Sequence, residues 1–385
     1  MILIKNVSCF DGTGIVENAS VLVSGSKIRS LTIGQLCDCG DADMVIDGKG
    51  KLLTPGFIDI HIHGCGGHDV MDGTTQAINA MAQIAAQNGT TSFLPTTVTM
   101  PPENTSRAVR AVKSSMAMRA GANILGVHLE GPFINKDRKG AQNEKYILKP
   151  SIPAFESIIG GELPMIKRVT LAPEIENCLE LIRYLREKDI CVSAGHTCAS
   201  AEEFAEAVRA GVTLCTHLFN GMNPLHHRDP GIIAGAFLND DIYTEFIPDL
   251  IHIDKDVLKL IVKIKGEDRC ILITDALSAA CLGDGIFDLG SQRVTVRDGI
   301  ARTDSGSLAG SIIMLNRAVK NMVLKVGVDL KAVLKMVTVN PAKVIGVDGF
   351  KGMIREGYDA DLNLLDENLD VVMSTVMGEV VQKAD

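Results

Sequence analysis

At 385 residues the chain is longer than a usual single domain, and it can hold a barrel of about 250 residues plus a smaller module. Apolar residues make up 46% of the chain and charged residues 22%, a mixture that excludes the disordered and fibrous classes. The net charge of −9, without any cluster of lysine and arginine, excludes general binding to nucleic acid or to an anionic membrane surface.

The chain start, "MILIKNVSCFDG", has no basic segment followed by an apolar core and a small-residue cleavage site. No apolar run in the sequence reaches the roughly 18 residues of a membrane span. We therefore expect a cytoplasmic protein that makes no membrane contact.

The two ends of the chain have strand character. The first fifty residues alternate short apolar segments with turns, and the tail "GMIREGYDADLNLLDENLDVVMSTVMGEVVQ" returns to the same pattern. We predict that the ends fold together into a small β-sandwich domain, built from residues 1–53 and 342–385.

Between these ends, apolar strands alternate with helix-like segments. Strands are predicted at 57–62, 91–96, 124–129, 166–171, 190–195, 212–217, 243–247 and 270–274. Periodic helical segments are predicted at 75–88, 175–188, 200–210, 254–265, 311–325 and 330–339. Eight alternating strands predict an α/β fold, a (β/α)8 TIM-type barrel over residues 54–341. An alternating, turn-rich segment after Asp275, "GIFDLGSQRVTVRDGIARTDSGSLAGS", predicts a hairpin excursion from the last loop.

The first predicted barrel strand carries two histidines in "DIHIHG". Side chains alternate along a strand, so Asp59, His61 and His63 share one face while the isoleucines share the other. Two imidazoles at the end of one rigid strand suit a divalent metal. An isolated pair of this kind is also compatible with a surface strand and two solvated histidines, so the rest of the chain must decide.

The ends of the other predicted strands carry further polar side chains. Active sites of barrels of this type lie at the carboxyl ends of the strands, so these side chains are expected to converge. The set consists of His61, His63, His128, Glu130, His196, His217, His252 and Asp275. Their convergence predicts a catalytic centre far more strongly than any member does alone.

The types of side chain indicate the chemistry. Imidazole and carboxylate groups suit Zn²⁺, Fe²⁺, Co²⁺ or Mn²⁺, whereas oxygen ligands alone would indicate Mg²⁺ or Ca²⁺. Such an ion lowers the pKa of a bound water to about 7. Asp275 can take a proton from that water and deliver it to a leaving amine, so the combination predicts hydrolysis.

Eight motifs, in order along the chain, carry a resemblance to a known family. They are "PGFIDIHIHG", "HLEGPF", "SAGHT", "THLFNGM", "HHRDPG", "LITDA", "GSLAGS" and "GYDADLNLLD". The chain resembles, from end to end, the N-acetylglucosamine-6-phosphate deacetylases of the amidohydrolase superfamily. The resemblance implies removal of the acetyl group from an amino-sugar phosphate, to give glucosamine 6-phosphate and acetate in amino-sugar catabolism and recycling.

The resemblance also implies roles for residues of this sequence. Glu130, His196 and His217 would hold the main metal, and His61 and His63 a second one, so that one or two divalent ions bind per subunit. Asp275 would be the general base and acid. The substrate would be held by Gln142, Asn220, Gly221, Arg228 and His252. In a homodimer, Arg228 would reach the neighbouring active site.

One position departs from the family pattern, because Leu250 in "PDLIHID" stands where a glycine is expected before the pair Ile251 and His252. His128 is interpreted as a supporting or core residue. His68, His226 and His227 are interpreted as loop histidines.

Three alternatives stay open beside this function. A cyclic amidase such as a dihydroorotase or hydantoinase would need a modified lysine at the end of strand four, but Lys167 lies at the start of that strand. A deacetylase for the galactosamine isomer differs only in how one hydroxyl is recognised. A catalytically inactive scaffold would have lost ligands, and this chain retains them.

Overall fold

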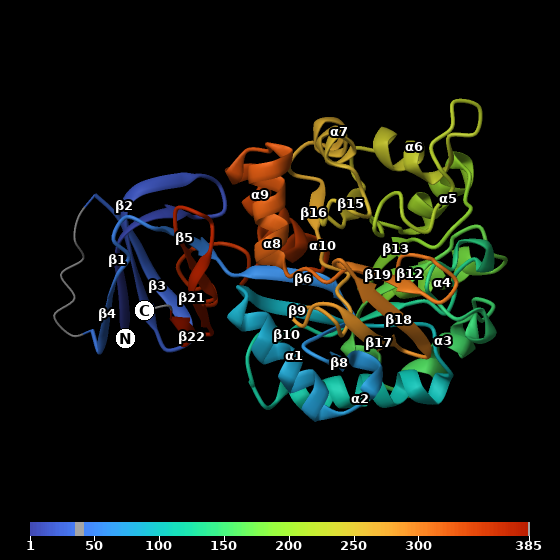
Figure 1. The fold of residues 1–385 in the computed structure, drawn as a ribbon, viewed down its shortest axis with the longest axis horizontal. Coiled ribbons are helices and arrows are strands. Elements are labelled where there is room, and N and C mark those ends of the chain that lie inside the picture. The colour runs from blue at the N-terminus through green and yellow to red at the C-terminus, as the bar shows by residue number, and fades with distance from the viewer. Residues whose placement is uncertain (35–41, 384–385) are drawn as a thin grey trace.

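The computed structural model describes residues 1–34 and 42–383, which form a sheet at the chain ends and a barrel beside it (Figure 1). The eight main barrel strands are parallel neighbours. They are β6 (Phe57–Ile62), β9 (Thr90–Thr97), β11 (Val127–Glu130), β12 (Ile166–Leu171), β13 (Cys191–Ala194), β14 (Leu214–Cys215), β15 (Tyr243–Phe246) and β16 (Cys270–Leu272). The short β10 (Asn123–Ile124) also pairs with β9. The predicted barrel is confirmed, with strand ends shifted by a few residues.

The barrel closes between its first and last strands. The amide of Asp275, just beyond β16, donates to the carbonyl of His61 on β6 at 2.9 Å. A parallel bridge between Ile62 and Ala276 continues this seam. The carboxyl ends of all eight strands therefore meet at one end of the barrel.

Strand β6 is buried on both faces, because all six of its residues are shielded from solvent. Ile58 and Ile60 pack in a cluster that includes Ala342 and Ile345 from the end of the chain. Parallel strands covered on both sides have this continuous burial. The His61 side chain therefore points into the barrel rather than to solvent, and the surface-strand reading is wrong.

Helices cover the outside of the barrel (Figure 1). Their bounds are α1 (Thr75–Gln87), α2 (Pro102–Met116), α3 (Ile152–Ile159), α4 (Cys178–Glu187), α5 (Ala201–Ala210), α6 (Gly231–Leu238), α7 (Lys255–Lys265), α8 (Leu315–Lys320), α9 (Leu330–Val337) and α10 (Val339–Val344). Side chains define several starts: Ser200 and Glu203 form a capping box at α5, and Asp254 caps α7. The helix predicted at 311–325 is shorter, because α8 passes into a π-helix, η5 (Asn321–Val326).

The chain ends form one eight-stranded sheet. It contains β1 (Ile2–Phe10), β2 (Ile15–Ser24), β3 (Lys27–Ile33), β4 (Met44–Asp47), β5 (Leu52–Pro55), β20 (Leu362–Leu365), β21 (Val371–Val376) and β22 (Glu379–Lys383). Strand β20 runs antiparallel to β5, with Leu365 opposite Leu52. The predicted joining of the two ends is thus present, and only Gly56 separates β5 from the first barrel strand.

Short elements lie in the loops next to the barrel strands, most of them at the carboxyl ends, whereas the 3-10 helix before β12 lies at an amino end. The predicted excursion after Asp275 is an antiparallel sheet of β17 (Gly285–Leu289), β18 (Gln292–Arg297) and β19 (Ile300–Thr303). A small pair, β7 (Gly64–Cys65) and β8 (His68–Asp69), follows β6, and the 3-10 helices are η1 (Val70–Asp72), η2 (Lys136–Arg138), η3 (Glu144–Tyr146) and η4 (Leu163–Met165). Within the described ranges, every helix is too short or too polar to cross a membrane.

Candidate active site

The first part of the site consists of two histidines at the end of β6. The side chains of His61 and His63 are almost fully buried, and their Nε2 atoms lie 3.3 Å apart. Asp275, across the barrel seam, places its Oδ1 atom 3.1 Å from Nε2 of His63 and 3.5 Å from Nε2 of His61. These three residues form the first group with metal-ligand geometry.

A second group comes from three other strand ends. Glu130 ends β11, His196 follows β13 and His217 follows β14. The Oε1 atom of Glu130 lies 3.1 Å from Nε2 of His196 and 3.1 Å from Nε2 of His217. Both histidines have positive φ, 49° and 27°, a conformation that costs an ordinary residue free energy and clusters at functional sites.

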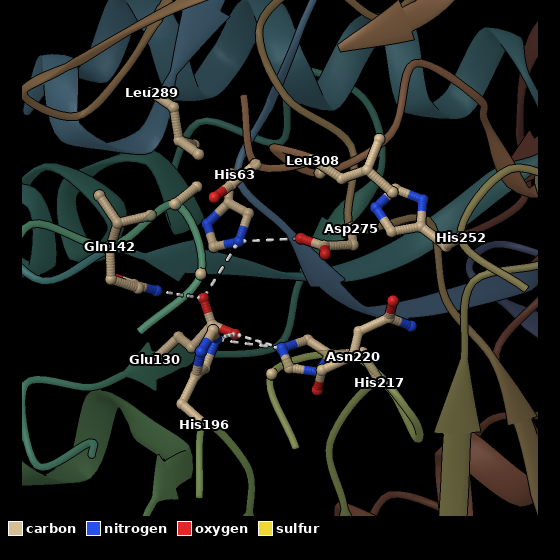
Figure 2. Close-up of a pocket in the computed structure, with 16 residues that line it drawn as sticks. His63, Glu130, Gln142, His196, His217, Asn220, His252, Asp275, Leu289 and Leu308 are labelled. Carbon is tan, nitrogen blue, oxygen red and sulfur yellow. Dashed lines mark hydrogen bonds and ion pairs between the residues drawn. The ribbon is translucent and has the colours of Figure 1, made fainter. Parts of the chain in front are cut away.

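Glu130 belongs to the second group and also contacts the histidines of the first (Figure 2). Its Oε1 is 3.3 Å from Nε2 of His61, and its Oε2 is 3.4 Å from Nε2 of His63. One carboxylate therefore contacts four imidazoles, in the position that a carboxylate bridging two ions would need. Lys167, near the start of β12, is not among the residues that form the two groups.

In each of the four histidines of the two groups, the ring nitrogen that faces away from Glu130, Nδ1, has a hydrogen-bond acceptor. Nδ1 of His61 donates to Glu245 at 2.9 Å, and Nδ1 of His63 donates to the Thr96 carbonyl at 3.1 Å. His196 and His217 donate from Nδ1 to the carbonyls of Arg138 and Asn220, at 2.8 Å and 3.0 Å. These acceptors assign the Nδ1 hydrogen, so each ring, in its neutral form, turns its Nε2 lone pair inward.

The inward-facing atoms fit a divalent cation. Nε2 of His196 and Nε2 of His217 are 3.1 Å apart, and two bare nitrogens at that distance repel each other unless a positive charge lies beside them. Imidazole nitrogens and carboxylate oxygens are the ligand set of Zn²⁺, Fe²⁺, Co²⁺ and Mn²⁺. The residues present therefore match the predicted kind of ion.

The electrostatics of the site favour positive charge. Burial acts to lower the pKa of His61, but the Glu130 and Asp275 carboxylates outweigh it and raise that pKa to about 9. Burial acts to raise the pKa of Asp275, but His61 and His63 outweigh it and hold that pKa at about 2. Both effects come from a concentrated negative field, for which protons and metal ions compete.

A cavity of about 250 Å³ opens beside the two groups (Figure 2). Gln142, Asn220, Gly221 and His252 line it, as the sequence predicts for substrate contacts. Gln142 donates from Nε2 to Oε2 of Glu130 at 2.6 Å and accepts from the amide of Thr99 at 2.6 Å, so its amide is fixed.

Gly221 is required by the geometry around His196. Its φ is +61°, and a Cβ added there would lie 2.9 Å from Nδ1 of His196 and 3.3 Å from the Arg138 carbonyl. A side chain would therefore push on the hydrogen bond that orients His196.

His252 lies in the cavity although Leu250 replaces the expected glycine. Leu250 has a φ of 69°, the left-handed conformation that glycine adopts most easily. The Asp249 carboxylate holds this turn, because it accepts from the amides of Ile251 and His252 at 2.9 Å each. It also accepts from Nδ1 of His252 at 2.7 Å, which fixes the ring.

Two predicted site residues do not line the cavity: His61 is fully buried in the first ligand group, and Arg228 lies away from the site. It is exposed on the loop before α6, where it contacts Nε2 of His227 at 2.7 Å. His128 lies beneath the site and bonds to Thr170 and Thr96 at 2.8 Å and 3.2 Å, in agreement with a supporting role.

Some lining residues were missed by the sequence analysis. Val98, Leu289 and Leu308 form an apolar side of the cavity, with Leu289 and Leu308 labelled in Figure 2. Leu289 belongs to β17 and Leu308 to the loop after β19, so the excursion covers part of the cavity. The alternating pattern predicts the excursion but not the direction in which it folds.

Comparison with known proteins agrees with the family resemblance found in the sequence. The family model described as "Amidohydrolase family" matches residues 52–381. A protein of Lysinibacillus sphaericus named N-acetylglucosamine-6-phosphate deacetylase is 38% identical over 98% of this chain and 97% of its own length. An Escherichia coli O157:H7 protein named N-acetylgalactosamine-6-phosphate deacetylase is 34% identical, over 87% of this chain and 89% of its own.

Solved structures give the same result. The N-acetylglucosamine-6-phosphate deacetylase of Thermotoga maritima superposes with a TM-score of 0.90 at 37% identity, covering 99% of this chain and 100% of that one. A mutant of the Mycobacterium smegmatis enzyme, solved in complex with N-acetyl-D-glucosamine 6-phosphate, has a TM-score of 0.93 at 27% identity and covers 99% of both chains. The predicted resemblance is confirmed, and the chain belongs to the amidohydrolase family, among relatives named N-acetylglucosamine-6-phosphate deacetylase.

Proposed function

We propose that this protein removes the acetyl group from N-acetyl-D-glucosamine 6-phosphate, giving glucosamine 6-phosphate and acetate in amino-sugar catabolism and recycling. The observation that carries the proposal is the convergence of both ligand groups on Glu130 beside a cavity. The relatives named for this reaction support it at 35–38% identity over nearly the full chain.

The metal would be held by the two groups described above. Glu130, His196 and His217 would hold one ion, and His61 and His63 would hold a second, with Glu130 shared between them. A bound Zn²⁺, Fe²⁺, Co²⁺ or Mn²⁺ would polarise a carbonyl oxygen and lower the pKa of a water molecule, so that hydroxide is available as the nucleophile at neutral pH. The remaining steps belong to side chains of this chain.

Asp275 would move the proton. Its ionised carboxylate lies 3.1 Å from His63, at the edge of the cavity, where it can take a proton from the attacking water. As the C–N bond breaks, the same carboxyl group would return that proton to the nitrogen, so that the amine leaves neutral. The acetic acid formed at the same time would then lose its remaining proton, to the amine or to solvent water, and become acetate. One residue thus serves as general base and then general acid.

His252 would orient the substrate amide. Asp249 fixes its ring through Nδ1 at 2.7 Å, which leaves Nε2 free to face the cavity. Gln142, held by Glu130 and Thr99, would contact the sugar from the opposite side of the cavity (Figure 2).

The phosphate would be bound with the help of a second copy of the chain. None of the described residues that line the cavity is a lysine or an arginine, yet the substrate carries a phosphate. We infer a homodimer in which the exposed Arg228 reaches the neighbouring cavity, while backbone N–H groups near Asn220 and Gly221 face the phosphate. Arginine suits this role because its planar fork matches phosphate oxygens.

The galactosamine isomer is a second candidate substrate, since one relative is named for it. A panel of N-acetyl hexosamines, with and without 6-phosphate, tests both after reconstitution with Zn²⁺, Fe²⁺, Co²⁺ or Mn²⁺. The expected result is acetate release that is fastest with N-acetylglucosamine 6-phosphate. Acetate release from none of the sugars, or hydrolysis of a cyclic amide alone, would contradict the proposal.

Two further predictions accompany this function. The cytoplasmic location stays a prediction. The division into a terminal domain, residues 1–53 and 342–385, and a barrel domain, residues 54–341, also stays a prediction.

A further inference from the structure

A charged pair lies inside the barrel, beneath the proposed metal centre. Arg168 on β12 has no solvent exposure and is the largest fully buried side chain of the described residues. Its guanidinium donates to both carboxylate oxygens of Glu245 on β15, at 2.6 Å and 2.8 Å, and neither side chain is exposed. Barrel interiors of this type are usually filled by branched apolar residues, so a charged pair there needs an explanation.

The Glu245 carboxylate connects the two ligand groups. Its Oε1 atom accepts from Nδ1 of His61 at 2.9 Å and from the backbone amide of His217 at 3.2 Å. His61 belongs to the first group and His217 to the second. Glu245 therefore contacts both groups from below without belonging to either.

His61 is the only one of the four centre histidines whose Nδ1 hydrogen is held by a side chain. His63, His196 and His217 donate instead to backbone carbonyls, which the fold itself keeps in place. A glutamate side chain has free torsions, so it can orient His61 only if something fixes the carboxylate in turn.

Arg168 is fixed from several directions. Besides Glu245 it donates to the Ile60 carbonyl on β6 at 3.1 Å, to Oγ of Ser193 on β13 at 3.0 Å and 3.2 Å, and to Oγ1 of Thr216 beyond β14 at 3.1 Å. Its guanidinium thus contacts groups around the barrel and holds the Glu245 carboxylate in one place.

Stability does not explain the pair. Two buried charges lose their hydration, and apolar residues of similar volume often give equal or greater stability in such a position. What apolar residues cannot do is accept the Nδ1 hydrogen of His61. Without that acceptor the ring can rotate, or carry its hydrogen on Nε2, and either change removes the lone pair that faces Glu130 and Asp275.

We propose that Arg168 and Glu245 are positioning residues that set the affinity of the metal position at His61 and His63. The inference rests on the metal centre proposed above. Glu245 keeps the Nε2 atom of His61 bare and aimed at that position, and Arg168 keeps Glu245 in place. The ion at Glu130, His196 and His217 depends on the pair much less, because backbone carbonyls orient both of its histidines.

The test compares two variants with the wild type. Arg168→Met/Glu245→Leu removes both charges and the acceptor, so no unpaired charge is left buried. Glu245→Asp keeps a charge for Arg168 but draws the carboxylate back from His61. Zn²⁺ content is measured per chain by mass spectrometry, and the affinity of each bound Zn²⁺ by competition with a chromogenic chelator.

The matched control is Lys351→Met/Asp361→Asn. This change removes another buried ion pair, with its atoms 2.5 Å apart, at the junction with the terminal sheet and away from the site. Both variants of the Arg168–Glu245 pair should lose about 10- to 100-fold in the affinity of one Zn²⁺ and keep the other, as loss of a supporting hydrogen bond at a metal site typically does. The control should bind both ions as the wild type does.

Three results would overturn the inference. In the first, the folded variants hold two Zn²⁺ with wild-type affinity. In the second, they lose both ions equally, which would show a general structural role. In the third, the wild type holds only one Zn²⁺. There would then be no second metal position whose affinity Arg168 and Glu245 could set. A wild type that binds no Zn²⁺, Fe²⁺, Co²⁺ or Mn²⁺ and releases no acetate would instead overturn the proposed function, together with what rests on it.

Discussion

Nε2 of His63 lies 3.1 Å from Oδ1 of Asp275, and this contact crosses the seam at which the last barrel strand meets the first. Residues from opposite ends of the barrel sequence thus share one edge of the cavity. The contact places Asp275 at the cavity, where it can exchange a proton with water, and also within the first ligand group.

Asp275→Asn should abolish most acetate release. An amide cannot accept the proton of the attacking water, and loss of general base and acid catalysis typically costs about 10²- to 10⁴-fold in rate. The ion at Glu130, His196 and His217 should remain, because Asp275 does not belong to that group. Steady-state rates and metal content, measured on the same sample, check this. Undiminished turnover, or a variant without any metal, would remove Asp275 from the proposed role.

The double substitution His61→Asn/His63→Asn should lower the bound metal by one ion per chain. Both rings belong to the first ligand group, whereas the second group contains neither. Metal content after dialysis and reconstitution is the measurement, with circular dichroism to show that the variant is folded. If the double variant binds no metal at all, the two positions are not separable.

Arg228→Ala should reduce selectivity for the phosphorylated sugar. A hydrogen bond to a charged group contributes about 1.5 to 3 kcal/mol, so kcat/KM for N-acetylglucosamine 6-phosphate should fall about 10- to 100-fold. The poor rate on unphosphorylated N-acetylglucosamine should barely change. Arg209→Ala, at another exposed arginine, is the control. Equal losses on both sugars would assign Arg228 to the fold or to the subunit contact, which size-exclusion chromatography would reveal.

Gly221→Ala should lower the affinity for the metal ion that His196 helps to hold. The added Cβ would lie 2.9 Å from Nδ1 of His196, and it would also strain a backbone with φ of +61°. Gly25→Ala is a matched control, because Gly25 has φ of +56° and open space around the added Cβ. The control should lose only about 1 kcal/mol in free energy of unfolding from backbone strain. Equal metal affinity in both variants would contradict the crowding of His196.

Acid should destabilise the fold partly through Glu245. Burial acts to raise the pKa of its carboxyl, but Arg168 outweighs it and lowers that pKa from 4.5 to about 2. Between these two pKa values the unfolded chain binds more protons than the folded one. The stabilisation that the ionised Glu245 gives the folded state is therefore complete above pH 4.5 and is lost as the pH falls toward 2. About 2 kcal/mol should be lost by pH 3.

Urea unfolding at pH 6 and pH 3 measures this loss. The wild type should lose about 2 kcal/mol more than Arg168→Met/Glu245→Leu, which lacks the titrating pair. Parallel losses in the two proteins would show that other carboxyl groups account for the acid sensitivity.

The sequence predicts the barrel well because its strands are apolar, regularly spaced and separated by helices with clear starts. Strand β6 illustrates this, since the alternation in "DIHIHG" already places His61 and His63 together. The pairing of Arg168 with Glu245 is not predictable in this way. Arg168 follows Lys167 in "IKRVTL", Glu245 lies in "YTEF", and only barrel closure shows that Arg168 and Glu245 face each other.

Other features depend on information outside the local pattern. Leu289, at the end of β17, lines the cavity, but alternation along the excursion does not show toward which part of the barrel the excursion folds. The left-handed turn at Leu250 is stabilised by Asp249, a contact between neighbours whose geometry a sequence does not specify. The proposed role of Arg228 would depend on a second copy of the chain, which a local sequence pattern does not describe.

The pairing of Leu52 with Leu365 has a consequence for synthesis of the protein on the ribosome. Strand β5 emerges early, but its antiparallel neighbour β20 emerges only when almost the whole chain has been made. Contacts between residues so distant in sequence form late, because a long loop must first close. Strand β5 can pair with β1 early, but it gains its second neighbour, β20, only after all the barrel strands have been made. Since only Gly56 separates β5 from β6, the strand that carries His61 should be anchored from both sides of β5 only at that late stage.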